Sequence, residues 1–549
     1  MRPPSPVARR ILSALLGLAI TAPARAVTLP PGFGDSLVAT VGAPTALAFT
    51  PDGRLLIATQ GGTLRVVQGG VLLPTPALSL GSAVCSNGER GLLGVAVDPQ
   101  FTTNHFIYLF YTFNKNALGC PSLNTTTPVE RISRFTLDVP TANVIDPATQ
   151  LVLLDNVLNF AGNHNGGQLR VGPDGYLYAG IGDGGCDYAG DSGCAGANDA
   201  SRDRNILNGK ILRIARDGSV PPTNPFLGAG TARCNVGPSA PGTICQETFL
   251  WGLRNPFRFA FRPSDNALFV NDVGEGSFEE IDLAQAGGDY GWPCREGAHT
   301  ALTTNHCSPT PPNMLDPFFE YPHGTIPGTS TTGCGSITGG AWVPAGAWPS
   351  VYDGTYLFAD FNCGAIARLT PGAPSTASDF ATGLGLQSVV ELLFGPSPTG
   401  TSLYYTTYAA GGQVRRIDFA APPPAATFRT LTPCRAIDTR RANGPTGGPA
   451  LQANLARTFP IAGACGVPPA AVAVAANVTV TGSSAAGSLR IGPAGTTPSL
   501  DTLPFPAGST KADNAVLGLF GTPAGSVTVV SGFASGTVHL VVDVTGYWQ

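Results

Sequence analysis

The sequence predicts an all-β protein in which a six-bladed β-propeller is followed by a smaller β-sandwich-like domain. The first observation is composition, since 71 of the 549 residues are Gly and 50 are Pro. Helix interiors exclude both residues, so this composition excludes a helical bundle or a coiled coil. The second is that 43% of the residues are hydrophobic, in runs along the whole chain, which excludes general disorder. The third is a strand–turn–strand sequence motif that recurs along the chain.

The recurring motif consists of a short apolar strand, a Pro-containing turn and a second apolar strand, and a third strand follows each copy. Five clear copies and one degenerate copy occur: AFTPDGRLLIA (48–58), AVDPQFTTNHFIYLFY (96–111), RVGPDGYLYAGIG (170–182), AFRPSDNALFVND (260–272), LFGPSPTGTSLYYTT (393–407) and, degenerate, WPSVYDGTYLFAD (348–360). We expect these strands to alternate apolar and polar residues, as half-buried antiparallel strands do. Repeats of roughly 45–50 residues with several strands each are typical of β-propellers, so six copies predict six blades within residues 27–420.

A Pro-rich stretch of low charge, residues 421–427, predicts a semi-rigid linker to a second domain. Residues 428–549 contain β-branched runs separated by Gly, Ser and Pro turns: AVAVAANVTV (471–480), SVTVV (526–530) and TVHLVVDVTGYW (537–548). This pattern indicates a β-sandwich-like domain of normal size. The domain has no acid–base pair or metal cluster, and its lone His539 lies in an apolar strand, where a structural role is favoured.

The first 26 residues have the pattern of a secretory signal peptide. An N-terminal region with three Arg precedes an apolar stretch of about ten residues, and Ala24-Arg25-Ala26 is an A-x-A cleavage site. The alternative, an uncleaved membrane anchor, is disfavoured because such a stretch is too short to span a bilayer. We therefore expect a secreted or periplasmic protein, cleaved near Ala26, with no transmembrane segment in the mature chain.

Twelve Cys, an even number in an exported chain, predict disulfides. Spacing alone does not fix the connectivity, but neighbours along the chain give six candidate pairs: Cys85–Cys120, Cys186–Cys194, Cys234–Cys245, Cys294–Cys307, Cys334–Cys363 and Cys434–Cys465. A zinc site is disfavoured because the chain has no CxxC and no His at zinc spacing. The formal net charge of −4 gives no reason to expect a nucleic-acid partner.

Two polar clusters could carry proton chemistry or bind an anion. Asn163 and His164 lie just before the third copy of the motif, and Asp183 follows the second strand of that copy. A His oriented by a carboxylate is a plausible general base, although a His that only hydrogen-bonds a loop is an equally good alternative. The second cluster contains Arg254 and Asn255, which can hydrogen-bond ligand oxygens. In the same cluster we expect Arg258 to be structural, stacked on an aromatic ring.

A third cluster, residues 272–280 (DVGEGSFEE), combines carboxylates with exposed backbone carbonyls. Calcium prefers such oxygen ligands, but the stretch is not an EF-hand loop. A solvated acidic turn is the alternative, and it would be favoured if the stretch stood alone.

Taken together, residues 40–419 resemble the glucose/sorbosone dehydrogenase family, which includes soluble quinoprotein glucose dehydrogenases, aldose sugar dehydrogenases and hedgehog-interacting-protein-like propellers. The stretches that carry the resemblance are ERGLLGVAVDPQF (89–101), HNGGQLRVGPDGYLYAGIGDGG (164–185), NILNGKILRI (205–214), LWGLRNPFRFAF (250–261), DVGEGSFEEIDLAQAGGDYGWP (272–293) and ITGGAWVP…GTYLFADFNCGAIARL (337–369). The resemblance implies a six-bladed propeller, in agreement with the repeat count.

The resemblance also implies a chemistry, the oxidation of the anomeric hydroxyl of an aldose by hydride transfer to pyrroloquinoline quinone (PQQ), with Ca²⁺ as Lewis acid and an external electron acceptor. By motif match, His164 is the base, Asp183 orients it and Arg254 polarises the quinone. The residues expected to contact the cofactor are Glu89, Asn163, Arg254, Asn255 and Arg368. Those expected to hold the metal are Gly274, Glu275 and Glu279.

The sequence departs from the family pattern where a Lys and Arg residues hold the carboxylates of PQQ. The Lys position falls near Val343-Pro344, one Arg position is Cys363, and Glu89 replaces a frequent Gln. Because PQQ has three carboxylates, two lost cations weaken its binding unless other groups replace them. Two alternatives therefore stay open, a cofactor-free propeller that binds a protein or glycan and a calcium-dependent lactonase or esterase. The C-terminal domain resembles β-rich segments of secreted bacterial proteins, and its position suggests glycan or surface contact.

Overall fold

A computed structural model of the chain describes residues 27–122, 126–185, 199–304, 307–372, 375–408, 411–420 and 426–549. The chain divides into two compact units, and the boundary along the sequence lies between Ala420 and Ala421. The predicted signal peptide, most of the predicted linker and the Cys186–Cys194 pair lie outside the described residues.

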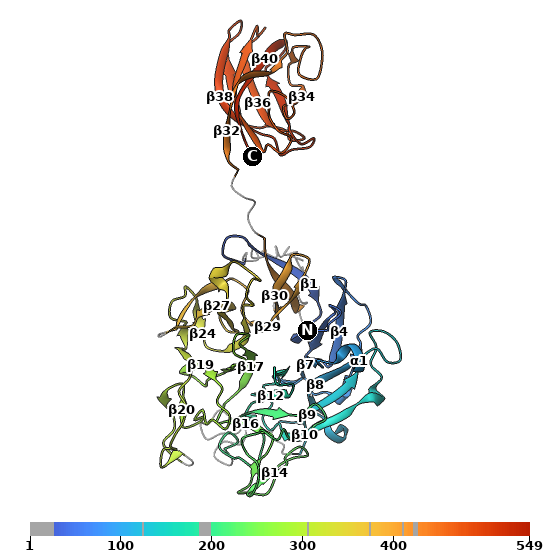
Figure 1. Ribbon diagram of the computed structural model, residues 1–549, viewed down its shortest axis with the longest axis vertical. Helices are drawn as coiled ribbons and strands as arrows, with labels where there is room; N and C mark the ends of the chain where they lie inside the picture. Colours follow the sequence, from blue (N-terminus) through green and yellow to red (C-terminus); the bar gives the residue numbers. More distant parts are fainter. Residues whose placement is uncertain are drawn as a thin grey trace, which may run out of the picture. The chain divides into compact units, whose positions relative to one another are not determined.

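The first unit is the predicted six-bladed propeller. Figure 1 shows its sheets set around a common centre, with β7, β17 and β29 beside that centre. In chain order the described sheets are β2-β3-β4-β5, β7-β8-β9-β10, β11-β12-β13-β16, β17-β18-β19-β22, β25-β26-β27-β28 and β29-β30-β31-β1. Each is antiparallel, so they are named blades one to six below.

The strands of the six blades have these bounds: β2 Pro44–Phe49, β3 Leu55–Thr59, β4 Thr63–Gln68, β5 Val71–Leu72, β7 Leu92–Val97, β8 Phe106–Phe113, β9 Val129–Thr136, β10 Leu151–Leu158, β11 Leu169–Val171, β12 Leu177–Ile181, β13 Lys210–Ile214, β16 Thr248–Trp251, β17 Pro256–Phe261, β18 Leu268–Asp272, β19 Phe278–Leu283, β22 Phe319–Pro322, β25 Ile337–Trp342, β26 Tyr356–Asp360, β27 Ala365–Thr370, β28 Thr376–Ala381, β29 Ser388–Ser397, β30 Gly400–Thr407, β31 Gln413–Phe419 and β1 Phe33–Thr40. Short strands lie outside the blades or at their edge: β6 Leu78–Ser79, β14 Thr231–Ala232, β15 Ile244–Cys245, β20 Arg295–Glu296, β21 His299–Thr300, β23 Gly324–Thr325 and β24 Thr332–Cys334.

The propeller ring is closed by its first strand. β1 pairs antiparallel with β31, from Phe33↔Phe419 to Thr40↔Gln413, and so completes blade six, which begins with β29. Phe33 packs edge-on against Trp348, Phe380 and Phe419 in the core of blades five and six. Segments from the two ends of the propeller sequence therefore share one sheet.

The expected alternation of apolar and polar residues is wrong for the second strands of the blades. Every residue of β3, β12, β18 and β26 is buried. Each blade packs between two neighbours, so both faces of its central strands lie in apolar cores. The blades were therefore predicted correctly from the repeated strand–turn–strand motif and its apolar runs, and not from an alternation of apolar and polar residues.

The alternating strand directions place the polar clusters at one end of the propeller. The segment that enters a first strand and the connection between second and third strands leave the sheets at the same end. His164 precedes β11, Asp183 follows β12, Arg254 precedes β17 and Asp272 ends β18. The four side chains therefore lie on the same face of the molecule.

The second unit is a sandwich of two sheets, with orders β32-β40-β35-β38 and β34-β39-β36-β37, and β33 pairs with β40. Here period two holds, because β35 alternates buried and partly exposed residues, and one cluster that includes Val474, Phe459 and Val529 fills the space between the sheets. His539 Nδ1 lies 3.1 Å from the Thr439 carbonyl oxygen and 3.2 Å from its hydroxyl oxygen, consistent with a structural role. The bounds are β32 Phe428–Asp438, β33 Leu451–Gln452, β34 Ala456–Pro460, β35 Ala473–Thr481, β36 Gly487–Pro493, β37 Leu503–Phe505, β38 Lys511–Gly518, β39 Ser526–Gly532 and β40 Thr537–Trp548.

Five of the six candidate disulfides are formed: Cys85–Cys120, Cys234–Cys245, Cys294–Cys307, Cys334–Cys363 and Cys434–Cys465. They join neighbours along the chain, as predicted. None of the helices in the described ranges is long and apolar enough to cross a membrane.

Candidate functional site

A cavity of about 280 Å³ lies on the propeller axis, because all six blades contribute to its lining. Its walls combine apolar and aromatic side chains with a small number of ionisable ones, as small-ligand sites do. The lining residues are Thr45, Gln60, Gly88, Glu89, Leu93, His164, Asn165, Gly166, Arg254, Asn255, Phe257, Arg258, Val273, Ser336, Thr338, Phe361, Val390 and Tyr408.

The structure brings His164 and Asp183 together at the cavity. His164 Nδ1 lies 2.7 Å from Asp183 Oδ1, and both side chains are buried. The backbone N–H of Gly185 donates to Asp183 Oδ1 and the Trp292 indole N–H donates to Oδ2, at 2.8 and 3.0 Å. A carboxylate held in this way fixes the orientation and tautomer of the imidazole.

Burial and charge act in opposite directions on this pair. Burial by itself lowers the pKa of His164, but the negative charge and hydrogen bond of Asp183 outweigh it and raise the pKa above its ordinary value, against the opposing charge of Arg254. Burial likewise raises the pKa of Asp183, and the charge of His164 reverses this, so that the pKa is lowered. The aspartate is therefore ionised and the imidazole is a stronger base than usual.

Glu89 lies at the cavity lining beside His164. Its Oε2 accepts the backbone N–H of His164 at 2.8 Å, so it positions the segment that carries His164. Asn163, which was expected to contact the cofactor, does not line the cavity, and its side-chain oxygen lies against Gly185. His164, the next residue, has a positive φ of 51°, so the chain turns between the two side chains.

Arg254 and Asn255 are held at the cavity by their backbone. Their N–H groups donate to the two oxygens of Asp272, at 2.9 and 2.7 Å, and Asn255 Oδ1 accepts the N–H of Gly166 at 3.0 Å. The Arg254 guanidinium lies 5.3 Å from the Trp292 ring centroid, next to the group that holds Asp183. One network therefore fixes the His164 imidazole and the Arg254 guanidinium beside the same cavity.

The residues predicted to bind calcium, Gly274 and Glu275 through their carbonyls and Glu279, each have hydrogen-bond partners in the protein. The Gly274 carbonyl accepts a hydrogen bond from Arg254 Nη1 at 2.7 Å, and the N–H of Glu275 donates to Glu296. The buried Glu279 carboxylate faces His323 Nε2 at 2.7 Å and accepts the N–H of Ile337 at 2.8 Å. None of the three predicted residues lines the cavity.

A different acidic cluster was missed. Asp272, Glu280 and Asp282 are buried, and each offers an oxygen within 4.8 Å of those of the other two. Both oxygens of Asp282 lack a hydrogen-bond partner. Burial raises the pKa of Asp272 to about 7, and burial with neighbouring carboxylates raises those of Glu280 and Asp282 well above their ordinary values. The signal was present in the sequence, because Glu280 and Asp282 share a strand face and Asp272 pairs with Glu280 across the sheet.

Arg368 was expected to contact the cofactor, but the structure places it elsewhere. Its guanidinium lies 5.0 Å from the ring centroid of Tyr352, in the connection between β25 and β26. That connection leaves blade five at the end opposite to Thr338, which lines the cavity. A motif match along β27 does not specify the direction in which a side chain points.

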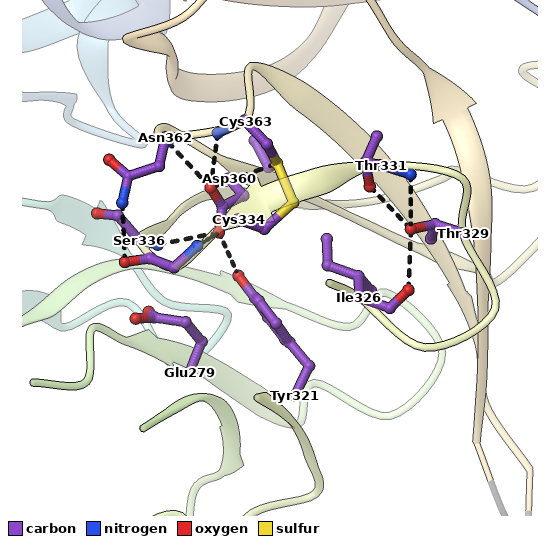
Figure 2. Close-up of a disulfide and its surroundings, with 12 residues drawn as sticks. Glu279, Tyr321, Ile326, Thr329, Thr331, Cys334, Ser336, Asp360, Asn362 and Cys363 are labelled. Carbon is purple, nitrogen blue, oxygen red and sulfur yellow. Dashed lines mark hydrogen bonds between the residues drawn. A yellow bond between two sulfur atoms is a disulfide. The ribbon is translucent and has the colours of Figure 1, made fainter. Parts of the chain in front are cut away.

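The blade-five wall of the cavity is fastened by a disulfide. Cys334 is bonded to Cys363, and Asp360 accepts the N–H groups of Ser336 and Cys363 at 2.9 and 3.2 Å (Figure 2). Ser336 and its neighbour in space Phe361 line the cavity. Val343, at the other position where the family has a cation, is buried in an apolar cluster. Neither position supplies a positive charge.

Comparison with known proteins places the propeller in context. The E. coli (strain K12) aldose sugar dehydrogenase YliI is 31% identical over 251 residues, which cover 46% of this chain and 58% of YliI. The hedgehog-interacting protein of Mus musculus is 28% identical over 242 residues, 42% of this chain and 31% of that protein. The chain thus spans less than two thirds of the length of these curated relatives.

A solved structure shares the fold. The PQQ-bound form of aldose sugar dehydrogenase from Streptomyces coelicolor superposes with a TM-score of 0.51 at 22% identity, over 71% of this chain and 99% of that one. Residues 41–343, more than half of the chain, match the family described as Glucose / Sorbosone dehydrogenase, and the match includes His164, Asp183 and Arg254. The chain therefore belongs to the glucose/sorbosone dehydrogenase family.

Proposed function

We propose that the propeller is a sugar dehydrogenase that oxidises the anomeric hydroxyl of an aldose, with PQQ in the axial cavity as the hydride acceptor. The observation that carries this proposal is the buried His164–Asp183 pair, which shares one cavity with the Arg254 guanidinium. Family membership and the relative named aldose sugar dehydrogenase support the substrate class. The sugar loses two electrons and two protons and becomes a lactone, and an external acceptor later reoxidises the cofactor.

The cavity residues fit a planar, anionic cofactor. Phe257, Phe361 and Tyr408 offer aromatic or apolar walls, and Arg254 and Arg258 offer guanidinium groups. The side-chain oxygen of Asn165 is buried without a hydrogen-bond partner, as expected for a group that meets a ligand. When bound, PQQ supplies a quinone carbonyl that accepts the hydride.

The chain's own residues then have separate tasks. His164 accepts the proton of the sugar hydroxyl at Nε2, and Asp183 stabilises the imidazolium that results. Arg254 donates hydrogen bonds towards the cofactor oxygen that gains negative charge. Asn255 and Glu89 hold the segments that carry these groups.

Calcium fits the cluster of Asp272, Glu280 and Asp282 better than the predicted residues. Three carboxylates are donors that Ca²⁺ prefers, and a cation there would satisfy the two unpartnered oxygens of Asp282. Such an ion would brace β18 and β19 beneath Arg254, whose N–H Asp272 accepts. No step of the reaction is assigned to it. Thermal unfolding with Ca²⁺ or EDTA tests this, since Ca²⁺ should raise Tm in the wild type and not in Asp282→Asn. Equal Tm values in Ca²⁺ and EDTA would instead mean protonated carboxylates.

The activity is tested by dye reduction over a panel of aldoses with added PQQ. We expect PQQ-dependent reduction by the wild type and a loss of about 10²–10⁴-fold in His164→Asn, the range for a general base. Asp265→Asn, an exposed residue paired with Arg262, serves as the control that should not change. Full activity of His164→Asn would reject the assignment of the base.

A second candidate is a cofactor-free propeller that binds a protein or glycan. The missing cations at Val343 and Cys363 favour it, as does the relative named hedgehog-interacting protein. Lack of PQQ binding by the correctly folded wild type would select this candidate. Lactone or ester turnover with Ca²⁺ and without PQQ would select the hydrolase instead.

The proposed site of action is outside the cytoplasm. Five disulfides fit an oxidising compartment, in line with the signal peptide expected for residues 1–26. The C-terminal sandwich is proposed to contact a glycan or surface. Detection of the chain without residues 1–26 in a periplasmic or culture fraction tests the export.

A further inference from the structure

The side of the cavity formed by β17 holds a buried cation to which the proposed reaction assigns no specific contact or step. Arg258 lines the cavity and is only 1% exposed. Its Nη1 donates to the Phe257 carbonyl at 2.7 Å and its Nη2 donates to the Thr45 carbonyl at 2.6 Å. The guanidinium carbon lies 4.3 Å from the Phe257 ring centroid. Thr45 belongs to blade one and Arg258 to blade four, so this side chain crosses the propeller axis.

Arg258 shares its counter-ion with a second arginine. Arg258 Nε lies 2.9 Å from Glu391 Oε2, and Arg170 Nη2 lies 2.7 Å from Glu391 Oε1. Arg170 also donates to the Leu47 carbonyl at 3.2 Å. The three side chains come from β17, β29 and β11, and they bridge blades four, six and three.

The charges of this cluster do not balance. Two guanidinium groups face one carboxylate, so the cluster carries one net positive charge, and Arg258 and Glu391 are both almost fully buried. An uncompensated charge in such a place is unfavourable unless an anion approaches it. Other carboxylates near the cavity have partners of their own. Glu89 accepts the backbone N–H of His164, and Asp183 bonds the His164 ring. Asp272 accepts the N–H groups of Arg254 and Asn255.

Arg258 also retains hydrogen-bonding capacity. A guanidinium has five N–H groups, and the hydrogen bonds to the Phe257 and Thr45 carbonyls engage one N–H on each Nη. Nε lies 2.9 Å from Glu391 Oε2 as an ion pair without a hydrogen bond. The second N–H of each Nη remains for a ligand in the cavity. Paired N–H groups on a planar guanidinium match a carboxylate well.

We propose that Arg258, held at the cavity by Glu391 and Thr45, is an anion anchor that binds a carboxylate of the cavity ligand. This inference rests on the proposed function for the identity of the ligand, a planar polycarboxylate. It assigns to blade four the charge that the family pattern expects near Val343 and Cys363. Glu391 then has a second role, because it partly cancels the charge of Arg258 and limits the affinity for anions.

The experiment is calorimetric titration of the full-length oxidised protein with three probes: PQQ, its uncharged trimethyl ester and benzene-1,2,4-tricarboxylate. Arg258→Gln should weaken PQQ binding about 10- to 100-fold, the value of hydrogen bonds to a charged group. It should change ester binding little. Glu391→Gln should strengthen PQQ binding, and Arg368→Gln, outside the cavity, should have no effect.

A second variant covers failure to fold, because either single change leaves a buried charge without its usual partner. Arg258→Gln/Glu391→Gln removes both charges and should fold, as judged by circular dichroism and Tm. If Arg258 only braces the blades, the double variant binds PQQ as tightly as the wild type. If Arg258 is the anchor, it binds PQQ weakly although it is folded.

The outcomes separate this inference from the proposed function. Equal PQQ binding by the wild type and both Arg258 variants overturns the anchor and leaves the dehydrogenase proposal standing. Binding of benzene-1,2,4-tricarboxylate that depends on Arg258, without PQQ binding, supports the anchor and rejects the cofactor. Binding of none of the three probes by the wild type overturns both.

Discussion

At the scale of single residues, the site depends on ionisable groups whose surroundings shift their pKa. His164 is a stronger base than an exposed histidine because Asp183 offsets the effect of burial. The proposed general base acts only in its neutral form, so we expect the proposed activity to be lost as the pH falls through the raised pKa.

The first prediction concerns the pH profile of Asp183→Asn. The substitution removes the charge that raises the pKa of His164, so the acidic limb of kcat/KM should move to lower pH. The maximal rate should fall about 100-fold or more, because the imidazole also loses its orientation. Measurement of kcat/KM against pH checks this, with Asp265→Asn as control. An acidic limb that stays in place would show that another group titrates there.

The second prediction concerns Glu130, a fully buried carboxyl on β9. Burial raises its pKa to about 7, although hydrogen bonds from Asn159 and Thr112 and the charge of Arg90 oppose this. Between about pH 4.5 and 7 the folded chain keeps a proton that the unfolded chain releases. The free energy of unfolding contributed by this group is therefore present at low pH and falls by about 3 kcal/mol as the pH rises through the window.

Urea denaturation at pH 5 and pH 8 measures this loss, and Glu130→Gln should abolish it. The difference between wild type and variant isolates Glu130 from other titrating groups. An identical loss of stability in both proteins would mean that Glu130 is ionised in the folded state at pH 5.

At the scale of elements, the cavity wall of blade five is held by covalent and polar links rather than by a cation. Figure 2 shows the Cys334–Cys363 disulfide beside Asp360, whose oxygens accept N–H groups from both connected loops. The links fix Ser336 and Phe361, which line the cavity.

The third prediction is that Cys334→Ser/Cys363→Ser loosens this wall. The disulfide joins positions 29 residues apart, and a loop of that size corresponds to about 2–4 kcal/mol of stability. We expect a lower Tm and weaker PQQ binding by titration. Cys434→Ser/Cys465→Ser, in the C-terminal unit, is the matched control and should leave PQQ binding unchanged. Unaltered binding in the first variant would show that Asp360 alone holds the wall.

The sequence predicted the propeller strands and the proximity of several site residues, and the differences from the structure have physical reasons. The strand–turn–strand motif repeats in every blade, so the six blades were predictable, whereas the pairing of β1 with β31 joins segments with no shared pattern. The proximity of His164, Asp183 and Arg254 was predictable because each stands next to a strand that a motif identifies, and their catalytic roles stay predictions. Arg368 and Glu279 were misplaced because a motif does not specify the direction of a side chain, and Glu279 instead faces His323.

At the scale of the whole molecule, the chain consists of a closed ring and a sandwich with separate cores. Within the part of the chain that the structure describes, the sandwich core consists of residues of the second unit and the blade cores consist of residues of the first. The cavity and all residues assigned to it lie in the first unit. Cofactor binding should therefore be independent of the second unit.

The fourth prediction is that a chain of residues 27–420 folds, binds PQQ and oxidises sugar like the full-length protein, because every blade and the closing strand are retained. The matched control removes residues 27–40 from the full-length chain. That cut removes β1, leaves an edge of β31 unpaired and takes Phe33 from its contacts with Trp348 and Phe380, so the ring should not close. Calorimetry and PQQ titration of both chains measure these outcomes. A propeller that needs residues 426–549 to bind PQQ would mean that the sandwich contributes to the site itself.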